Sequence, residues 1–339
     1  MAIAWSCAGF TCLLAVLHWL EFFRVRREEV ALRAQLATLD RQSARSAQAL
    51  AVAARRLARH PTAPSTDGRG LLVLSVETRL PGNFTMLGAP GRPVLNVGAG
   101  ASWSSWAAKP RLFHQHLSEL AALQPGRIVI LADGMDTIHG GCTEQQLLSA
   151  YHAVVGASGG APVVFGAEHC CFPWRSHCEW YENFTHRRDT VLAAFGTERP
   201  YEAFADCQRC RDFDEPLLDS RCSSPPAYQH LNSGFAMGPV VSLLAALSVW
   251  LGRYTAEKGT DQLQAHKVIF ERPDLVTLDY AGGLVLNVGD MSDSVVGDLL
   301  EVKDGVLFNR RTQRPQCFVH GAGRGKGIAL RLMSQLLGG

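Results

Sequence analysis

The chain has 339 residues, of which 47% are hydrophobic and 19% are charged. This length and apolar content suffice for one large folded domain, because the fraction of surface that a chain buries rises with its size. The formal net charge of +2 provides neither the basic stripe of a nucleic-acid-binding protein nor the charge excess of a disordered one, so nucleic acid is not an expected partner.

An apolar segment occupies the beginning of the chain. Nearly every residue from Ala2 to Leu20 is apolar, a length that suits a membrane-spanning helix, and no small-x-small cleavage site follows it. We therefore predict a single-pass signal anchor at residues 1–23. Arg24, Arg26 and Arg27 follow the segment while no Lys or Arg precedes it, and by the positive-inside rule this favours a cytosolic remainder of the chain.

Residues 24–60 are rich in Ala, Leu, Arg and Gln and contain neither Gly nor Pro, which predicts a continuous helical stalk. Leu32, Leu36, Leu39 and Leu50 belong to a weak heptad pattern, so the stalk is expected either to form a homodimeric coiled coil or to remain a lone solvated helix. Residues 61–70 contain Pro, Ser and Gly and are predicted to be a linker.

Apolar runs and helical periodicity alternate from residue 71 onwards. Strands are predicted for Leu71–Val76, Pro90–Val97 and Ala161–Phe165, and helices for Lys109–Leu123 and Thr143–Val155. This alternation is typical of an α/β sheet, in which ligands bind at the carboxyl ends of the strands.

A further strand is predicted within Arg127–Thr137, where an apolar, largely β-branched run ends in Asp133 and Asp136. Carboxylates at a strand end are ligands for a hard divalent cation, although an acidic turn after a strand is also common without one. Asp290 and Asp293 have the same spacing after another apolar run, so spacing alone does not separate the two pairs.

Eight cysteines lie outside the apolar segment. They are Cys142, Cys170, Cys171, Cys178, Cys207, Cys210, Cys222 and Cys317. An even, clustered set indicates disulfides and an oxidising lumen, and the sequons Asn83-Phe-Thr85 and Asn183-Phe-Thr185 agree with that compartment, against the positive-inside bias. Cys207-Gln-Arg-Cys210 also has the spacing of half a zinc site, which would suit a cytosolic protein.

Five short segments resemble, in order and approximate spacing, the N-terminal glycosyltransferase domain of procollagen-lysine hydroxylases, which is related to the collagen galactosyltransferases. They are Leu71–Thr78, Ile128–Asp136, Phe165–Trp174, Leu231–Gly238 and Val319–Gly323, and Asp261-Gln262 falls where that family has an acidic run followed by Gln. The resemblance covers residues 70–330. It implies a GT-A type, Rossmann-like fold for residues 71–335, with UDP-galactose or UDP-glucose as donor and Mn²⁺ as cofactor.

The resemblance also implies roles for individual residues. Asp133 and Asp136 match the family's Asp-x-x-Asp metal motif, and His320 matches the histidine that completes the metal ligands. The residues that match donor-binding positions, or that follow the matched histidine in a glycine-rich basic turn, are Glu77, Thr78, Lys109, Gly321, Gly323 and Lys326. That turn is not a Walker A loop, because Gly327 stands where Ser or Thr should follow the lysine.

Three further residues are candidates for catalysis. Glu168 and Asn232 fall beside the sugar pocket that the resemblance implies, and Asp261 is a candidate base on the sugar or acceptor side. A structural explanation competes for each, because an Asn-Ser-Gly turn needs its glycine in any fold and surface aspartates are abundant.

The chain departs from the family in two respects. A Cys-rich, aromatic insertion is predicted at residues 169–228, where it would either shape an acceptor site or pack its own small core. Nothing resembles the lysyl hydroxylase portion, so we expect a stand-alone transferase in the endoplasmic reticulum or Golgi membrane. Its acceptor would be a protein or glycan hydroxyl, with hydroxylysine or galactosyl-hydroxylysine implied by resemblance only. The alternative is a catalytically inactive, transferase-like binding protein.

Overall fold

The computed structural model describes residues 70–78, 94–169, 181, 183–197, 229–252, 260–289 and 291–338. The predicted signal anchor, the stalk and all but the last residue of the linker lie outside these ranges, as does most of the predicted insertion. Among the residues that are described, no helix is both long and apolar enough to cross a membrane.

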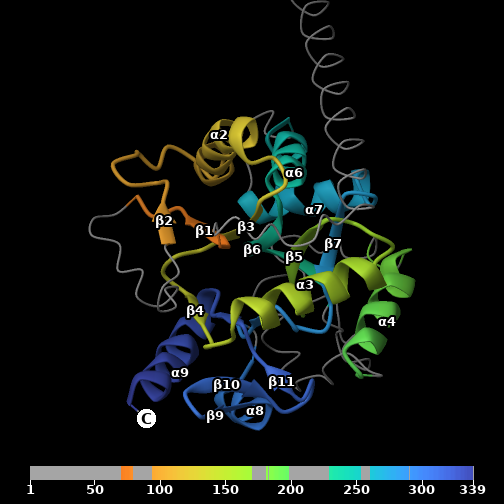
Figure 1. The fold of residues 1–339 in the computed structure, drawn as a ribbon. Coiled ribbons are helices and arrows are strands. Elements are labelled where there is room, and N and C mark those ends of the chain that lie inside the picture. The colour runs from red at the N-terminus through yellow and green to blue at the C-terminus, as the bar shows by residue number, and fades with distance from the viewer. Residues whose placement is uncertain are drawn as a thin grey trace, which may run out of the picture. The chain divides into compact units, whose positions relative to one another are not determined.

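A six-stranded mixed sheet lies at the centre of the described fold (Figure 1). Its strands, in spatial order, are β2 (Val94–Asn96), β1 (Leu72–Ser75), β3 (Ile128–Ala132), β6 (His230–Pro239), β5 (Val163–Glu168) and β7 (Val276–Asp279). Strand β6 is antiparallel to both of its neighbours, and the other pairs are parallel. The carboxyl ends of β1, β3, β5 and β7 therefore share one edge with the beginning of β6.

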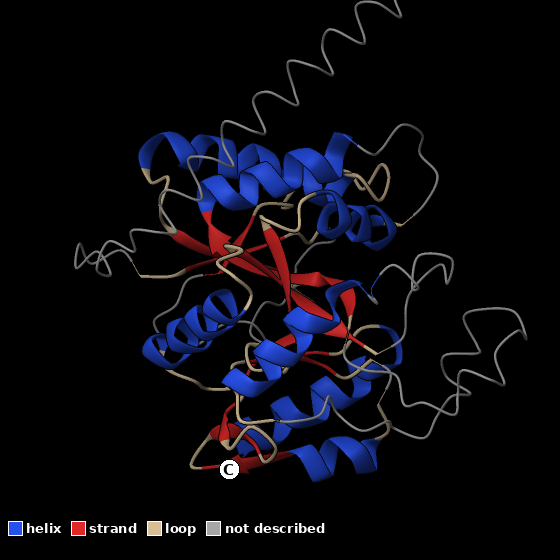
Figure 2. Ribbon diagram, turned by 90° about the vertical axis from the view of Figure 1, so that its right-hand side faces the viewer, coloured by secondary structure: helices blue, strands red, loops and turns tan. Residues whose placement is uncertain are grey.

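Helices cover both faces of this sheet (Figure 2). Helices α2 (Ala108–Leu123), α6 (Val240–Gly252) and α7 (Asp261–Glu271) pack together on one face, whereas α3 (Glu144–Ala157) and α4 (Thr185–Ala194) lie on the other. Strands buried on both faces need apolar residues throughout, which explains the unbroken Val, Ile and Leu runs of β1 and β3.

Local sequence signals determine where several helices begin. The Thr143 hydroxyl accepts a hydrogen bond from the backbone N–H of Gln146, whose side chain returns the bond to the Thr143 N–H, and this capping box starts α3. The Thr260 hydroxyl caps α7 in the same position. Such caps satisfy backbone donors that have no partner within the helix.

A second sheet joins segments from three parts of the chain. Strand β12 (Phe318–His320) lies between β4 (Thr137–His139), to which it is antiparallel, and β8 (Val285–Asn287), to which it is parallel. Helix α9 (Lys326–Gly338) follows β12 after a short 3-10 helix, η3 (Gly323–Gly325), and packs against β4 and β12.

The third sheet is a small antiparallel meander, formed by the part of the sequence that connects β8 to β12. Helix α8 (Asp293–Leu299) leads into β9 (Leu300–Lys303), β10 (Val306–Asn309) and β11 (Arg314–Pro315). Asp304 and Gly305 have φ values of 53° and 73°, the left-handed conformation that a tight two-residue hairpin turn requires.

The predicted α/β class is confirmed, and the arrangement is compatible with a Rossmann-like fold. The strands predicted at Leu71–Val76, at Ala161–Phe165 and within Arg127–Thr137 are present, as are the helices predicted at Lys109–Leu123 and Thr143–Val155. Part of the strand predicted at Pro90–Val97 is present as β2, and residues 79–93 lie outside the described ranges.

Candidate metal centre

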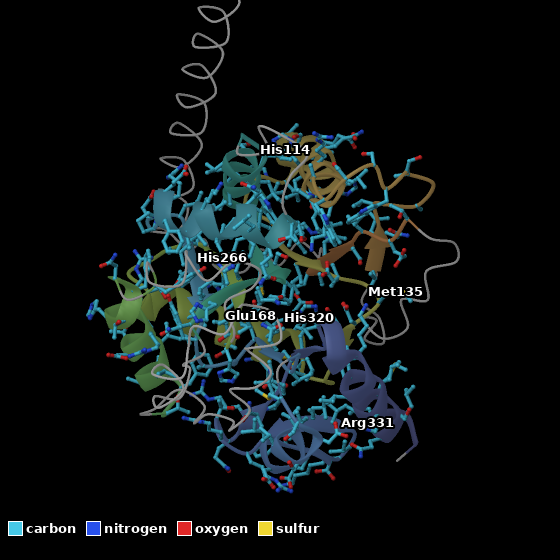
Figure 3. The ribbon with its side chains drawn as sticks, turned by 180° about the vertical axis from the view of Figure 1, so that it is seen from behind. His114, Met135, Glu168, His266, His320 and Arg331 are labelled. Carbon is cyan, nitrogen blue, oxygen red and sulfur yellow. A yellow bond between two sulfur atoms is a disulfide. The ribbon has the colours of Figure 1, made fainter. Side chains whose placement is uncertain are left out.

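The two predicted metal-binding acids lie on the turn that connects the main sheet to the second sheet. Asp133 directly follows β3, and its backbone N–H donates to the carbonyl oxygen of Gly234 at 2.9 Å. Asp136 directly precedes β4, and its carbonyl oxygen accepts from the N–H of Gly321 at 2.7 Å. Both ends of the turn are therefore fixed by distant strands. Met135, which lies between the two acids and is labelled in Figure 3, is 38% exposed.

Strand pairing brings His320 to this turn. His320 ends β12 and is paired in register with Thr137, the residue after Asp136. Its Nε2 atom lies 3.4 Å from Asp136 Oδ1 and 3.9 Å from Asp133 Oδ2. One ligand atom from each of the three residues lies within 4.8 Å of the others, so they form a possible metal-binding triad.

Two atoms of this triad lack the hydrogen bonds that buried polar atoms normally have. Both His320 Nε2 and Asp136 Oδ1 are buried without a hydrogen-bond partner. Leaving such atoms unpaired costs free energy, and a shared cation would satisfy both at once. The residues present therefore fit a divalent ion with two oxygen ligands and one nitrogen ligand.

The charges around the triad favour a bound cation. Burial alone would raise the pKa of Asp136, but the His320 imidazole in its protonated form, and then the Lys326 ammonium, lower it to about 2. A cation bound at Nε2 in place of that proton would likewise favour the ionised carboxylate. For Asp133, burial raises the pKa, and the nearby carboxylates of Asp136 and Asp261 add to that effect against the attraction of Lys109. A divalent cation would relieve this repulsion between carboxylates.

Lys109, a predicted donor-binding residue, is already engaged with the acids. This buried side chain projects from α2, and its Nζ lies 2.9 Å from Asp133 Oδ1, 2.7 Å from Asp261 Oδ2 and 3.2 Å from the Ser233 carbonyl oxygen. Burial opposes its charge, but the two carboxylates raise its pKa above the ordinary value. Asp133 therefore directs Oδ1 to Lys109, while Oδ2 is the oxygen that faces His320.

Asp261, the predicted base, is the first residue of α7 and is buried. Besides the ion pair with Lys109, its Oδ2 accepts a hydrogen bond from the Ser233 hydroxyl at 3.2 Å. Lys109 therefore lies between Asp261 and Asp133 and connects Asp261 to the triad.

Glu168 and Asn232, the other catalytic candidates, belong to one buried hydrogen-bond network. Glu168 ends β5, and its carboxylate accepts from Asn232 Nδ2 at 2.7 Å and from the side-chain amide of Gln262. The Asn232 Oδ1 atom in turn accepts from the N–H of Gly234 at 2.8 Å. In this arrangement the two side chains hold the beginning of β6 in place.

An irregularity in β6 places two further residues at the centre. Phe165 pairs with Ala236 while Gly166 pairs with Asn232, so Ser233, Gly234 and Phe235 form a bulge relative to β5. The bulge presents the Ser233 carbonyl to Lys109 and places Gly234 under the His320 ring. A Cβ atom on Gly234 would lie 2.2 Å from that ring, so only glycine fits there.

The remaining predicted donor-binding residues surround the same edge. Glu77 and Thr78 follow β1, which is parallel to β3 with Ser75 beside Ala132, and Asn96 holds the Glu77 backbone through two hydrogen bonds. On the other side, Lys326 begins α9 and places Nζ 3.3 Å from Asp136 Oδ2 with 52% of its side chain exposed. Gly321 is buried against Gly325, and Gly323 is exposed with a φ of 54°.

The second acidic pair does not form a comparable site in the described residues. Asp293 begins α8 and forms an exposed ion pair with Arg331 of α9, and Asp290 lies outside the described residues. A pocket of about 440 Å³ between α8, β9 and α9 includes Asp293 and Arg331 in its lining, and none of the triad residues contributes to it.

One residue in contact with the triad was not predicted from the sequence. Asn287, the last residue of β8, is buried and its Oδ1 lies 2.7 Å from His320 Nδ1. Its only local signal is an asparagine at the end of an apolar run, and its role depends on a pairing between β8 and β12 that no local pattern predicts.

A disulfide connects the two segments that carry the triad. Cys142 follows β4 and Cys317 precedes β12, and the two are bonded with a Cα–Cα distance of 5.0 Å. The sequence predicted disulfides without assigning partners, and this pair is bonded in the structure. The other six cysteines of that prediction, including the Cys207 and Cys210 of the zinc alternative, lie outside the described residues.

No protein-family model matches the chain, and a search of curated proteins found no match either.

Proposed function

We propose that this protein is a Mn²⁺-dependent glycosyltransferase of the GT-A type that transfers galactose or glucose from a UDP-sugar to a hydroxyl acceptor. The observation that carries the proposal is the meeting of Asp133, Asp136 and His320, with two unpaired buried atoms directed at each other. Oxygen ligands with one imidazole suit Mn²⁺ better than Mg²⁺, which prefers oxygen ligands alone.

The chemistry of such a transfer explains the arrangement of the surrounding charges. When bound, the divalent ion supplies Lewis-acid stabilisation of the negative charge that develops on the departing diphosphate. Lys326, half exposed beside Asp136 at the beginning of α9, would attract the same phosphate charge, and the helix N-terminus adds to that attraction. The single positive charge of Lys109 lies between Asp133 and Asp261 and reduces the repulsion between these two carboxylates.

The compartment and acceptor belong to the same proposal. The Cys142–Cys317 disulfide and the exposed sequon residue Asn183 support a lumenal catalytic domain in the endoplasmic reticulum or Golgi. The resemblance to procollagen-lysine hydroxylases supports hydroxylysine or galactosyl-hydroxylysine of collagen-like protein as acceptor.

A screen of UDP-sugar hydrolysis tests the proposal. We expect the purified chain to hydrolyse UDP-galactose or UDP-glucose slowly in the presence of Mn²⁺, because water replaces the acceptor when none is supplied. Chelation should stop the reaction, and renewed Mn²⁺ should restore it. Binding of a UDP-sugar without turnover under any of these conditions would instead indicate the inactive binding protein. A chain that neither binds nor hydrolyses any UDP-sugar would contradict both functions.

A further inference from the structure

The side chain of Asn287 connects His320 to the main sheet. Strand β8 is parallel to β12 and pairs Asn287 with His320, so the two buried residues lie side by side. On the opposite side of Asn287 is β5, where Ala167 offers its carbonyl oxygen and Gly166 leaves space. A Cβ atom on Gly166 would lie 3.0 Å from Asn287 Nδ2, so the amide is closely packed.

Hydrogen bonding defines which way this amide points. Asn287 Nδ2 lies 2.6 Å from the Ala167 carbonyl oxygen, which can only accept, so the amide nitrogen must face Ala167. The opposite orientation would bring two oxygens together. Oδ1 is therefore the atom that lies 2.7 Å from His320 Nδ1.

The orientation of the amide has a consequence for the imidazole. An amide oxygen can only accept, so a hydrogen bond at this position requires the hydrogen on Nδ1 of His320. In the charged ring, Nε2 also carries a hydrogen, which faces the carboxylates. In the neutral ring, which carries one hydrogen, the bond at Nδ1 leaves Nε2 with its lone pair. Nε2 is the nitrogen that faces Asp136 Oδ1 at 3.4 Å and Asp133 Oδ2 at 3.9 Å.

We propose that Asn287 is a positioning residue that fixes His320 as the Nδ1–H tautomer, with Nε2 prepared as a metal ligand. Histidine ligands are commonly oriented in this way by an acceptor at the other ring nitrogen, which also raises the basicity of the ligand. Here the acceptor is an uncharged amide that is itself held by Ala167. The inference rests on the proposed function only for the identity of the ligand that Nε2 receives.

The tautomer can be read in metal-free protein. Protein labelled with ¹⁵N-histidine is examined at a pH where the ring is neutral, by two-bond ¹H–¹⁵N correlation, and a His320→Gln sample identifies the His320 signal. We expect the hydrogen on Nδ1 in the unaltered chain. A hydrogen on Nε2 would overturn the proposal. Because neither metal nor nucleotide is present, a chain that has the expected tautomer but hydrolyses no UDP-sugar would contradict the proposed function alone.

Asn287→Leu separates positioning from a general structural role. Leucine is similar in size but accepts no hydrogen bond, so the Nδ1–H preference should be lost and Mn²⁺ affinity should fall about 10–100-fold, as is typical when such a partner is removed. The matched control is Asn309→Leu, which removes another buried asparagine that bonds to Gln316 and to backbone N–H groups. It should leave the tautomer and the Mn²⁺ affinity unchanged.

Mn²⁺ binding is measured by the loss of the free-ion electron paramagnetic resonance signal, with thermal unfolding recorded for each variant. An Asn287→Leu chain that keeps the Nδ1–H tautomer, or an equal loss of affinity in both variants, would overturn the positioning role. If Asn287→Leu does not fold, the tautomer of the unaltered chain decides alone.

Discussion

Gly234 shows how a single residue determines the position of a metal ligand. The His320 ring occupies the space that a side chain would fill at Gly234, and the Gly234 backbone also accepts from Asp133 and donates to Asn232. Any side chain there must displace either the ring or the bulge of β6. The predicted Asn-Ser-Gly segment thus contributes to the centre through its glycine as much as through its asparagine.

Gly234→Ala is expected to weaken Mn²⁺ binding by at least about tenfold, because the imidazole must move away from Asp136 and metal geometry tolerates only small displacements. A Mn²⁺ titration checks this. Gly126→Ala is the matched control, since a Cβ atom there meets nothing within 4 Å. Equal Mn²⁺ affinity for Gly234→Ala and the unaltered chain would show that His320 is not a ligand in its observed position.

At the scale of elements, β6 connects the centre to the surrounding core. His230 begins this strand, and the Tyr181 ring packs edge-on against it with ring centroids 5.1 Å apart. The Tyr181 hydroxyl accepts from the Leu231 N–H at 3.1 Å and is hydrogen-bonded to His266 of α7. Tyr181 therefore holds the beginning of β6, which precedes the bulge, against the core.

The buried His230 at the beginning of β6 should make the fold less stable in acid. Burial, and then the neighbouring His266 and His169, lower the pKa of His230 to about 3. The unfolded state, with a histidine pKa near 6.5, binds the proton more readily than the folded state does. The free energy of unfolding is therefore unaffected by His230 above pH 6.5 and decreases as the pH falls from 6.5 toward 3. Each pH unit in that window costs about 1.4 kcal/mol.

Urea unfolding at pH 7 and pH 5 measures the effect. Between these values His230 should account for about 2 kcal/mol of the loss in unfolding free energy. His230→Gln should remove that part of the pH dependence, although the variant itself is less stable at pH 7. The exposed His186, changed to Gln, serves as control and should keep the original dependence. An unchanged pH dependence in His230→Gln would contradict the assignment to His230.

At the scale of the whole molecule, the candidate centre is assembled from segments that are distant in sequence. The short strands β4 and β12 carry Asp136 and His320 at one end of their pairing, and the Cys142–Cys317 disulfide joins the same segments at the other end. The covalent bond spans a sequence separation of 175 residues. Closing so long a loop in the unfolded chain stabilises the folded state.

Replacing both Cys142 and Cys317 by Ser should therefore lower the free energy of unfolding by about 2–4 kcal/mol. Urea unfolding measures this loss. Peptide mapping of the unaltered protein, denatured without reductant, should find the two cysteines linked to each other. Finding either as a free thiol, or an unfolding free energy equal to that of the double variant, would contradict the bond.

The sequence predicts local structure well and long-range contacts poorly, for physical reasons. The apolar run before Asp133 and the Thr143 cap of α3 are local signals, and both elements are present as predicted. His320 was identified by resemblance only, because its contact with Asp136 depends on the pairing of two three-residue strands. The contact of Asn287 with His320 and the bulge of β6 have no local signal, since each is defined by a neighbouring strand.

The most direct test of the central claim is a Mn²⁺ titration of the unaltered chain beside Asp136→Asn and Asp293→Asn. Asp136→Asn removes a ligand charge from the triad, whereas Asp293→Asn changes an exposed residue of the other acidic pair. The account predicts one Mn²⁺ per chain, affinity weakened by more than about 100-fold in Asp136→Asn, and no change in Asp293→Asn. Mn²⁺ bound by Asp136→Asn as tightly as by the unaltered chain would contradict it.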